Sequence, residues 1–106
     1  MPFYQLETLS TRDLFPGFAA RLVHTPRMTL SFVEGIAGSA FPEHQHPHEQ
    51  VVVVLAGELE VTVPGETLRL TPGMVYAIPP DVPHSGRAVT DCRILDTFAP
   101  SRDDYR

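Results

Sequence analysis

The chain has 106 residues, of which 42% are hydrophobic and 20% are charged. This balance is typical of a globular protein of one domain and argues against a disordered chain. Eight arginines face 13 acidic residues, and the net charge of -5 gives no general attraction to nucleic acid or to an anionic membrane. We therefore expect one domain over residues 1–106 that binds a small molecule and neither nucleic acid nor a membrane.

The chain shows no sequence signal of export or of membrane insertion. Its longest apolar run, 51–56, is far shorter than the roughly 20 residues of a membrane span. The first residues do not combine a basic region with an apolar core, so no secretory signal is visible. A single cysteine, Cys92, excludes an internal disulfide and a thiolate cluster. We expect a cytoplasmic protein.

Prolines and glycines divide the chain into short segments. The best candidate for an amphipathic helix, 14–22, is interrupted by Pro16 and Gly17. Residue alternation and β-branched or aromatic content predict strands at 28–36, 49–55, 59–63, 67–70, 74–78, 87–88 and 92–98. Many short strands at such intervals, with no helix between them, predict an all-β sandwich or barrel.

Three of the five histidines fall within residues 43–50. Residues two apart in a strand point to the same face, so His44 and His46 are predicted to lie side by side, with Gln50 at the same parity. A barrel could bring the distant His84 opposite this pair. Three imidazoles and one amide oxygen suit a divalent transition metal. The alternative is that these histidines are surface residues in a proline-rich loop.

Two further details affect this predicted metal site. His48 shares the parity of the histidine pair, but Pro47 would introduce a bulge that rotates it away, so we expect His48 beside the site or at the surface. The amide of Gln50 would leave the ion its full charge, which favours Lewis-acid chemistry over redox cycling. Alternatively, Gln50 forms hydrogen bonds inside the barrel and a water molecule completes the coordination sphere.

The last predicted strand carries a second group of candidate residues. Asp96 and Phe98 have the same parity and face one side of the strand. If that side is the barrel interior, Asp96 is a carboxylate near the metal that can transfer protons. After Pro100 ends the strand, Arg102 can fold over the barrel mouth and bind a substrate carboxylate through two hydrogen bonds. The alternative is a polar strand end with a surface salt bridge.

The spacing of the histidines resembles the first motif of the cupin family. In this sequence Gly38 is followed after five residues by His44 and His46, then after three residues by Gln50 and after six by Gly57. Cupins have glutamate at the position of Gln50. The amide is therefore the one departure in this motif that touches the chemistry.

A second motif of the same family runs from Gly73 through Pro79-Pro80-Asp81 to His84 and Ala88. Asp81 and Ala88 stand where cupins have glycine and asparagine. The two motifs together cover roughly residues 30–98. The resemblance implies an all-β cupin fold, the double-stranded β-helix or jelly-roll barrel, with N-terminal strands within 1–37, a barrel over 38–98 and a C-terminal tail, expected to be partly ordered, over 99–106.

The ligand motif and the closing segment 94–105 together resemble the small cupins related to the pectin-degradation protein KdgF, which convert 4,5-unsaturated monouronates to linear ketonised forms. Ser101 stands where that family usually has proline. The resemblance implies metal ligands at His44, His46, Gln50 and His84 and further active-site residues at Asp96, Phe98 and Arg102.

For the function, this resemblance implies a metal-dependent isomerase or lyase-type enzyme acting on a sugar acid. Its cofactor would be one divalent transition metal, namely Zn, Ni, Mn or Fe, and single-domain cupins of this kind commonly form homodimers. Three alternatives stay open. They are an oxygen-using cupin dioxygenase, a polyketide-type cyclase and a non-catalytic small-molecule binder.

Overall fold

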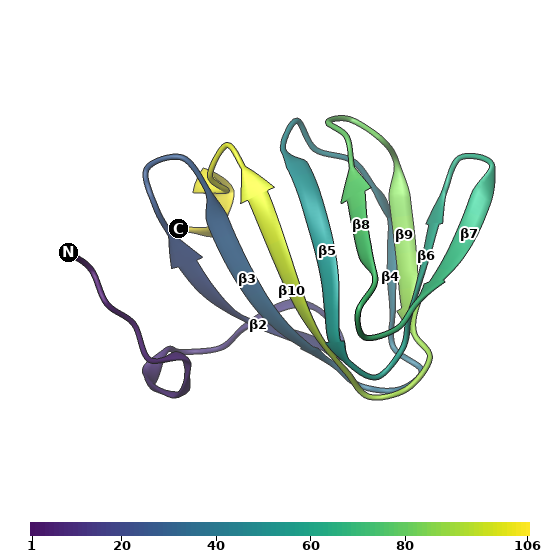
Figure 1. The fold of residues 1–106 in the computed structure, drawn as a ribbon, viewed down its shortest axis with the longest axis horizontal. Coiled ribbons are helices and arrows are strands. Elements are labelled where there is room, and N and C mark those ends of the chain that lie inside the picture. Colours follow the sequence, from purple (N-terminus) through teal and green to yellow (C-terminus); the bar gives the residue numbers. More distant parts are fainter.

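The computed structural model describes all residues, 1–106, and is almost entirely β-structure (Figure 1). Its strands are β1 (Arg12–Phe15), β2 (Phe18–His24), β3 (Thr29–Gly35), β4 (Ala40–His44), β5 (Glu49–Ala56), β6 (Leu59–Val63), β7 (Glu66–Leu70), β8 (Val75–Ile78), β9 (His84–Ala88) and β10 (Cys92–Ala99). Two short 3-10 helices, η1 (Leu6–Thr8) and η2 (Asp103–Tyr105), flank the strands. No helix has the length and apolar character that crossing a membrane requires.

The strands form two antiparallel sheets. The larger sheet has the order β1-β2-β3-β10-β5-β8, and the smaller has the order β4-β9-β6-β7. The chain crosses repeatedly between them, because β3, β5, β8 and β10 lie in one sheet while β4, β6 and β9 lie in the other. This arrangement confirms the predicted all-β jelly roll.

Near the N-terminus the sequence pattern is less informative than elsewhere. The segment 14–22 forms no helix, because Pro16 and Gly17 make the turn between β1 and β2. Gly17 has φ of +85°, a left-handed conformation that glycine adopts at little cost. The predicted strands in the rest of the chain are confirmed to within a few residues. The exception is β4, whose proline and polar residues gave no strand signal.

The inner face of the larger sheet changes from polar to apolar along its central strands. Three cross-strand rows line it: Thr29–Phe98–Gln50, Ser31–Asp96–Val52 and Val33–Ile94–Val54. The apolar row joins residues of the smaller sheet, such as Leu59 and Val61, in one hydrophobic core. The barrel interior therefore has an apolar end and a polar end. The polar end is the upper one in Figure 1, where β10 ends.

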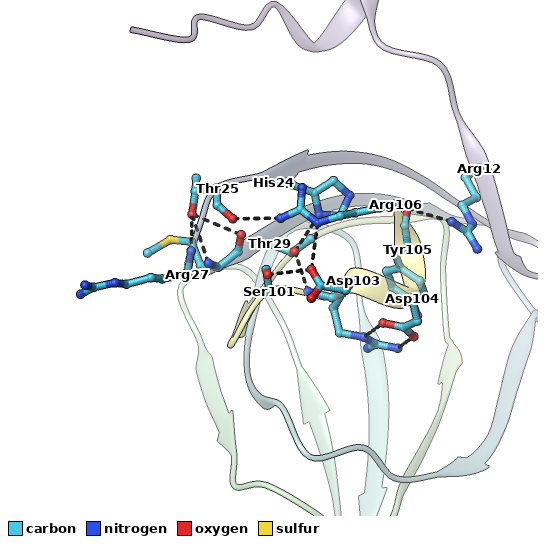
Figure 2. Close-up of polar contacts among 12 residues, drawn as sticks. Arg12, His24, Thr25, Arg27, Thr29, Ser101, Asp103, Asp104, Tyr105 and Arg106 are labelled. Carbon is cyan, nitrogen blue, oxygen red and sulfur yellow. Dashed lines mark hydrogen bonds and ion pairs between the residues drawn. The ribbon is translucent and has the colours of Figure 1, made fainter.

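The C-terminal segment, expected to be a partly ordered tail, is instead part of the polar end. Ser101 and Arg102 are buried, and the backbone N–H of Arg102 donates to Thr29 Oγ1 over 2.8 Å. Arg12 Nη1 donates over 2.8 Å to the carbonyl of Tyr105 (Figure 2). The polar composition of this segment predicted exposure, but its backbone groups form hydrogen bonds with residues of β1 and β3.

Candidate metal centre and substrate cavity

His44 and His84 lie side by side on neighbouring strands of the smaller sheet, and not in opposite sheets. They are paired residues of β4 and β9, and their ring centroids are 4.3 Å apart. The pairing of β4 with β9 shifts register between Phe41 and His44, and this irregularity places the His44 ring beside that of His84. The ring of Phe41 packs edge-on against His44. Gly86 on β9 makes room for Phe41, because a Cβ at position 86 would collide with that ring.

His44 and His46 lie close together, as predicted, with ring centroids 5.8 Å apart, but the prediction that they share one strand was wrong. β4 ends at His44 and β5 begins at Glu49, so His46 lies in the connector 45–48, which crosses from the smaller sheet to the larger. The backbone N–H of Asp81 donates to the His46 carbonyl over 2.8 Å. Asp81 adopts φ of +63°, in the left-handed region, where the cupin pattern has glycine. The crossing of the chain, and not strand periodicity, brings the two imidazoles together.

All three imidazoles are oriented in the same way by backbone carbonyls. The Nδ1 atoms of His44, His46 and His84 each lie 2.9 Å from a carbonyl oxygen, of Pro42, His48 and Val82 respectively. Because a carbonyl can only accept, each Nδ1 carries the proton and each Nε2 carries a lone pair.

The three free lone pairs have few partners within the chain. One ring nitrogen of each histidine lies within 4.8 Å of those of the other two. The Nε2 atom of His84 is buried without a hydrogen-bond partner. Imidazoles whose Nδ1–H is fixed by a second group are the usual ligands of transition metals. This donor set fits a divalent ion.

Gln50 enters the same space from β5, in the opposite sheet. Its Oε1 lies 3.1 Å from Nε2 of His46, and its Nε2 donates to Asp96 Oδ1 over 3.1 Å. With the tautomer above, His46 Nε2 and Gln50 Oε1 are both acceptors, so a cation shared between them would offset their repulsion. The structure thus brings all four predicted ligand side chains together.

Burial and charge shift the titration of these groups. Burial lowers the pKa values of His46 and His84, and the positive charge of Arg102 acts in the same direction. Both rings are thereby held in the neutral form that binds metals. Burial raises the pKa of Asp96 to about 7, against the hydrogen bond from Gln50 and the charge of Arg102, which both lower it.

A cavity between the two sheets joins the polar end to the apolar end. Gln50, His84, Asp96 and Arg102 line it at the polar end, together with His44 and Tyr105. Asp96 and Phe98 both face inward, as their parity predicts. Sequence reasoning assigned no role to Tyr105, because the contact depends on how the chain folds back after β10. A small molecule entering this cavity would meet His44, His84, Asp96 and Arg102 together.

Arg102 is held on several sides. Its side chain is 8% exposed, and its Cζ lies 4.7 and 4.0 Å from the ring centroids of Phe98 and Tyr105, two rings that are perpendicular to each other. Its Nε and Nη2 donate to the two carboxylate oxygens of Asp104 over 3.0 and 2.9 Å. The edge of the guanidinium that spans Nε and Nη2 is therefore occupied by Asp104.

His48 lies beside the cluster of imidazoles and is half-buried. Its ring centroid is 5.6 Å from that of His46, and its carbonyl orients the His46 ring. Its own Nδ1 is buried without a partner. This placement agrees with the expectation that His48 lies next to the site.

Known proteins resemble this chain over most of its length. The family profile described as Cupin domain matches residues 32–98. The solved structure of KdgF from Halomonas sp. has a TM-score of 0.92 and 31% identity, covering 100% of this chain and 99% of that one. The H2HPP isomerase of Bacillus subtilis is 40% identical over 103 residues, which is 93% of this chain and 43% of that protein.

A regulator is also among the similar proteins. The HTH-type transcriptional regulator PuuR of Escherichia coli (strain K12) is 32% identical over 92 residues, which is 80% of this chain and 50% of the regulator. The chain spans about half the length of these two curated relatives. The similarity to them therefore concerns one part of each protein.

Proposed function

Because this chain belongs to the cupin family, we propose that it is a metal-dependent cupin enzyme acting on a small carboxylated substrate. The reaction we propose is the ring opening and ketonisation of a 4,5-unsaturated monouronate. One observation carries the proposal: three imidazoles of the same tautomer converge beside the amide of Gln50, and this amide is hydrogen-bonded to a half-buried carboxylate, Asp96.

We propose that His44, His46, His84 and Gln50 hold one divalent transition ion, either Zn, Ni, Mn or Fe. Such an ion supplies Lewis-acid polarisation of a substrate hydroxyl or carboxylate oxygen when it is bound. Asp96 helps to prepare the site, because it accepts from Gln50 Nε2 and so turns Oε1 toward His46. The neutral amide favours Lewis-acid chemistry over redox cycling.

Asp96 is the proposed proton carrier. In the reaction a proton leaves the anomeric hydroxyl, the ring C–O bond breaks, and a proton adds to the vinyl carbon, so the step is an isomerisation with no net proton change. One carboxylate facing the substrate can perform both transfers. Asp96 is the carboxylate that lines the cavity, which supports this role.

Phe98 and Arg102 are proposed to bind the sugar acid. The buried ring of Phe98 offers an apolar surface to one face of the substrate ring. The guanidinium of Arg102 lines the same cavity and attracts the substrate carboxylate. Together they would hold the reacting atoms next to Asp96.

Proton NMR of a 4,5-unsaturated monouronate tests the proposal. We expect the vinyl proton signal to disappear faster with the metal-loaded protein than without it, and a chelator to abolish the acceleration. No acceleration with a fully loaded protein would contradict the proposal. Oxygen consumption would then favour a dioxygenase, and tight ligand binding without turnover would favour a binder, a role in keeping with the resemblance to PuuR.

We also propose that the chain forms a homodimer through the outer face of the larger sheet. Leu55 and Val75 on that face are 48% and 65% exposed. Arg93 and Glu34 are paired neighbours on its rim, so two identical faces can meet with opposite charges opposed. Sedimentation analysis should give a dimer that Val75→Asp dissociates while the metal content stays unchanged. A monomeric wild-type protein would contradict this proposal.

A further inference from the structure

The guanidinium of Arg102 presents two edges that can each bind a carboxylate, and only one of them is occupied. Asp104 accepts from Nε and Nη2, at 3.0 and 2.9 Å. Asp104 accepts nothing from Nη1, and Nη2 retains a second hydrogen. These two nitrogens form the outer edge of the fork, which can hold another carboxylate through two parallel bonds.

Two aromatic rings contact the guanidinium of Arg102 as well. Its Cζ lies 4.0 Å from the ring centroid of Tyr105 and 4.7 Å from that of Phe98, and these two rings are perpendicular to each other. The backbone N–H of Arg102 is bonded to Thr29 on β3, which anchors the start of the η2 segment. Figure 2 shows Asp104 and Tyr105 together on that segment. A guanidinium restrained in this way can meet a ligand with little loss of rotational freedom.

Asp104 is suited to restrain Arg102 without entering the cavity. Its side chain is 55% exposed, whereas that of Arg102 is 8% exposed, so the pair extends from the surface to the interior. The hydrogen bonds from Arg102 keep the pKa of Asp104 below its usual value, and the carboxylate stays ionised at neutral pH. Asp104 does not line the cavity, whereas Arg102 and Tyr105 do.

We propose that Asp104 is a positioning residue, which holds Arg102 so that its Nη1–Nη2 edge receives the carboxylate of the substrate end-on. This inference takes from the proposed function only that the ligand carries a carboxylate. It does not require that the protein turns the ligand over. It also revises the sequence-based expectation for Arg102. The arginine serves two carboxylates at once, one from the chain and one from the ligand.

The test compares how metal-loaded variants bind D-galacturonate and its methyl ester, measured by calorimetry. We expect the wild type to prefer the acid. Asp104→Asn should weaken binding of the acid roughly tenfold, the effect of one well-placed charge-assisted hydrogen bond, and leave the ester unaffected. Asp103→Asn is the matched control. It removes the same charge one residue away, where the carboxylate binds Arg106 and Ser101 and not Arg102.

Three results would overturn the inference. They are a wild type without preference for the acid, an Asp104→Asn variant that loses acid and ester equally, and one that binds the acid more tightly because a competing carboxylate has gone. Because binding needs no turnover, the two proposals fail separately. Acid-selective, Asp104-dependent binding without ketonisation would support this inference and contradict the proposed reaction.

Discussion

The two ends of the barrel interior are built by the same strands and differ in what they present. β5 places Gln50 at one end and Val54 at the other, and β10 places Phe98 and Ile94 in the corresponding rows. Every one of these residues faces inward. Strand periodicity thus determines which residues reach the interior, whereas the position along the strand determines whether they join the core or the candidate site.

The largest expected effect is on turnover at the polar end, and it should occur without a change in metal binding. Asp96→Asn should lower turnover of the unsaturated monouronate by about 10²–10⁴, the usual contribution of a general acid–base group. The metal content should not change, because an asparagine oxygen can still accept from the Gln50 amide. Glu43→Gln, at an exposed position next to His44, should keep full activity. An Asp96→Asn variant with wild-type turnover would show that another group carries the proton.

A change at the apolar end should affect stability and not the metal. Leu59 is 2% exposed in the core, and Leu59→Ala should lower the free energy of unfolding by about 2–5 kcal/mol. Urea denaturation measures this loss, and metal competition measures affinity in the folded protein. Met74→Ala, at a position that is 47% exposed, should change stability far less. If Leu59→Ala also weakened metal binding tenfold, the two ends would not be independent.

A smaller effect is expected at the turn that supports His46. Asp81 has φ of +63°, which costs alanine about 1–2 kcal/mol relative to a residue that tolerates this conformation. Asp81→Ala should therefore lower the unfolding free energy by about that amount, whereas Asp81→Gly should be nearly neutral. Thermal unfolding of the two variants distinguishes them. Equal stabilities would show that the left-handed backbone is not the constraint at this position.

The smallest effect concerns the pH dependence of stability at the polar end. Arg102 lowers the pKa of Asp104 below its ordinary value of 3.8, so the ion pair stabilises the folded state above that pH. This contribution is lost as the pH falls through the lowered pKa. The difference in unfolding free energy between wild type and Asp104→Asn should therefore shrink in acid. A constant difference from pH 5 to pH 2 would contradict this account.

Much of the fold follows from local sequence. The four consecutive valines and the alternating segment at 59–63 identify β5 and β6, because burial on one or two faces sets their patterns. The spacing of the histidines and Gln50 along the sequence also pointed to the four side chains that converge at the candidate metal centre. The break between His44 and His46 could not be predicted, since it depends on a crossing between sheets.

The restraint of Arg102 is a second feature that local sequence does not contain. Tyr105 and Asp104 follow Arg102 closely in the chain, and their polar character predicts only the exposure that Asp104 has, not their contacts with Arg102. Their actual positions depend on a bond from Arg102 to Thr29, which is 73 residues away. Contacts at such separation arise only when β3 and β10 pair.

The connector 45–48 has a consequence for how such a chain can change its length during evolution. Four residues cross between two sheets, present His46 and accept the bond from Asp81, so an insertion or deletion there would displace His46 relative to His44. The turn at Gly65 between β6 and β7 is exposed and has open space around it. Length variation should therefore accumulate at that hairpin and be absent from the connector.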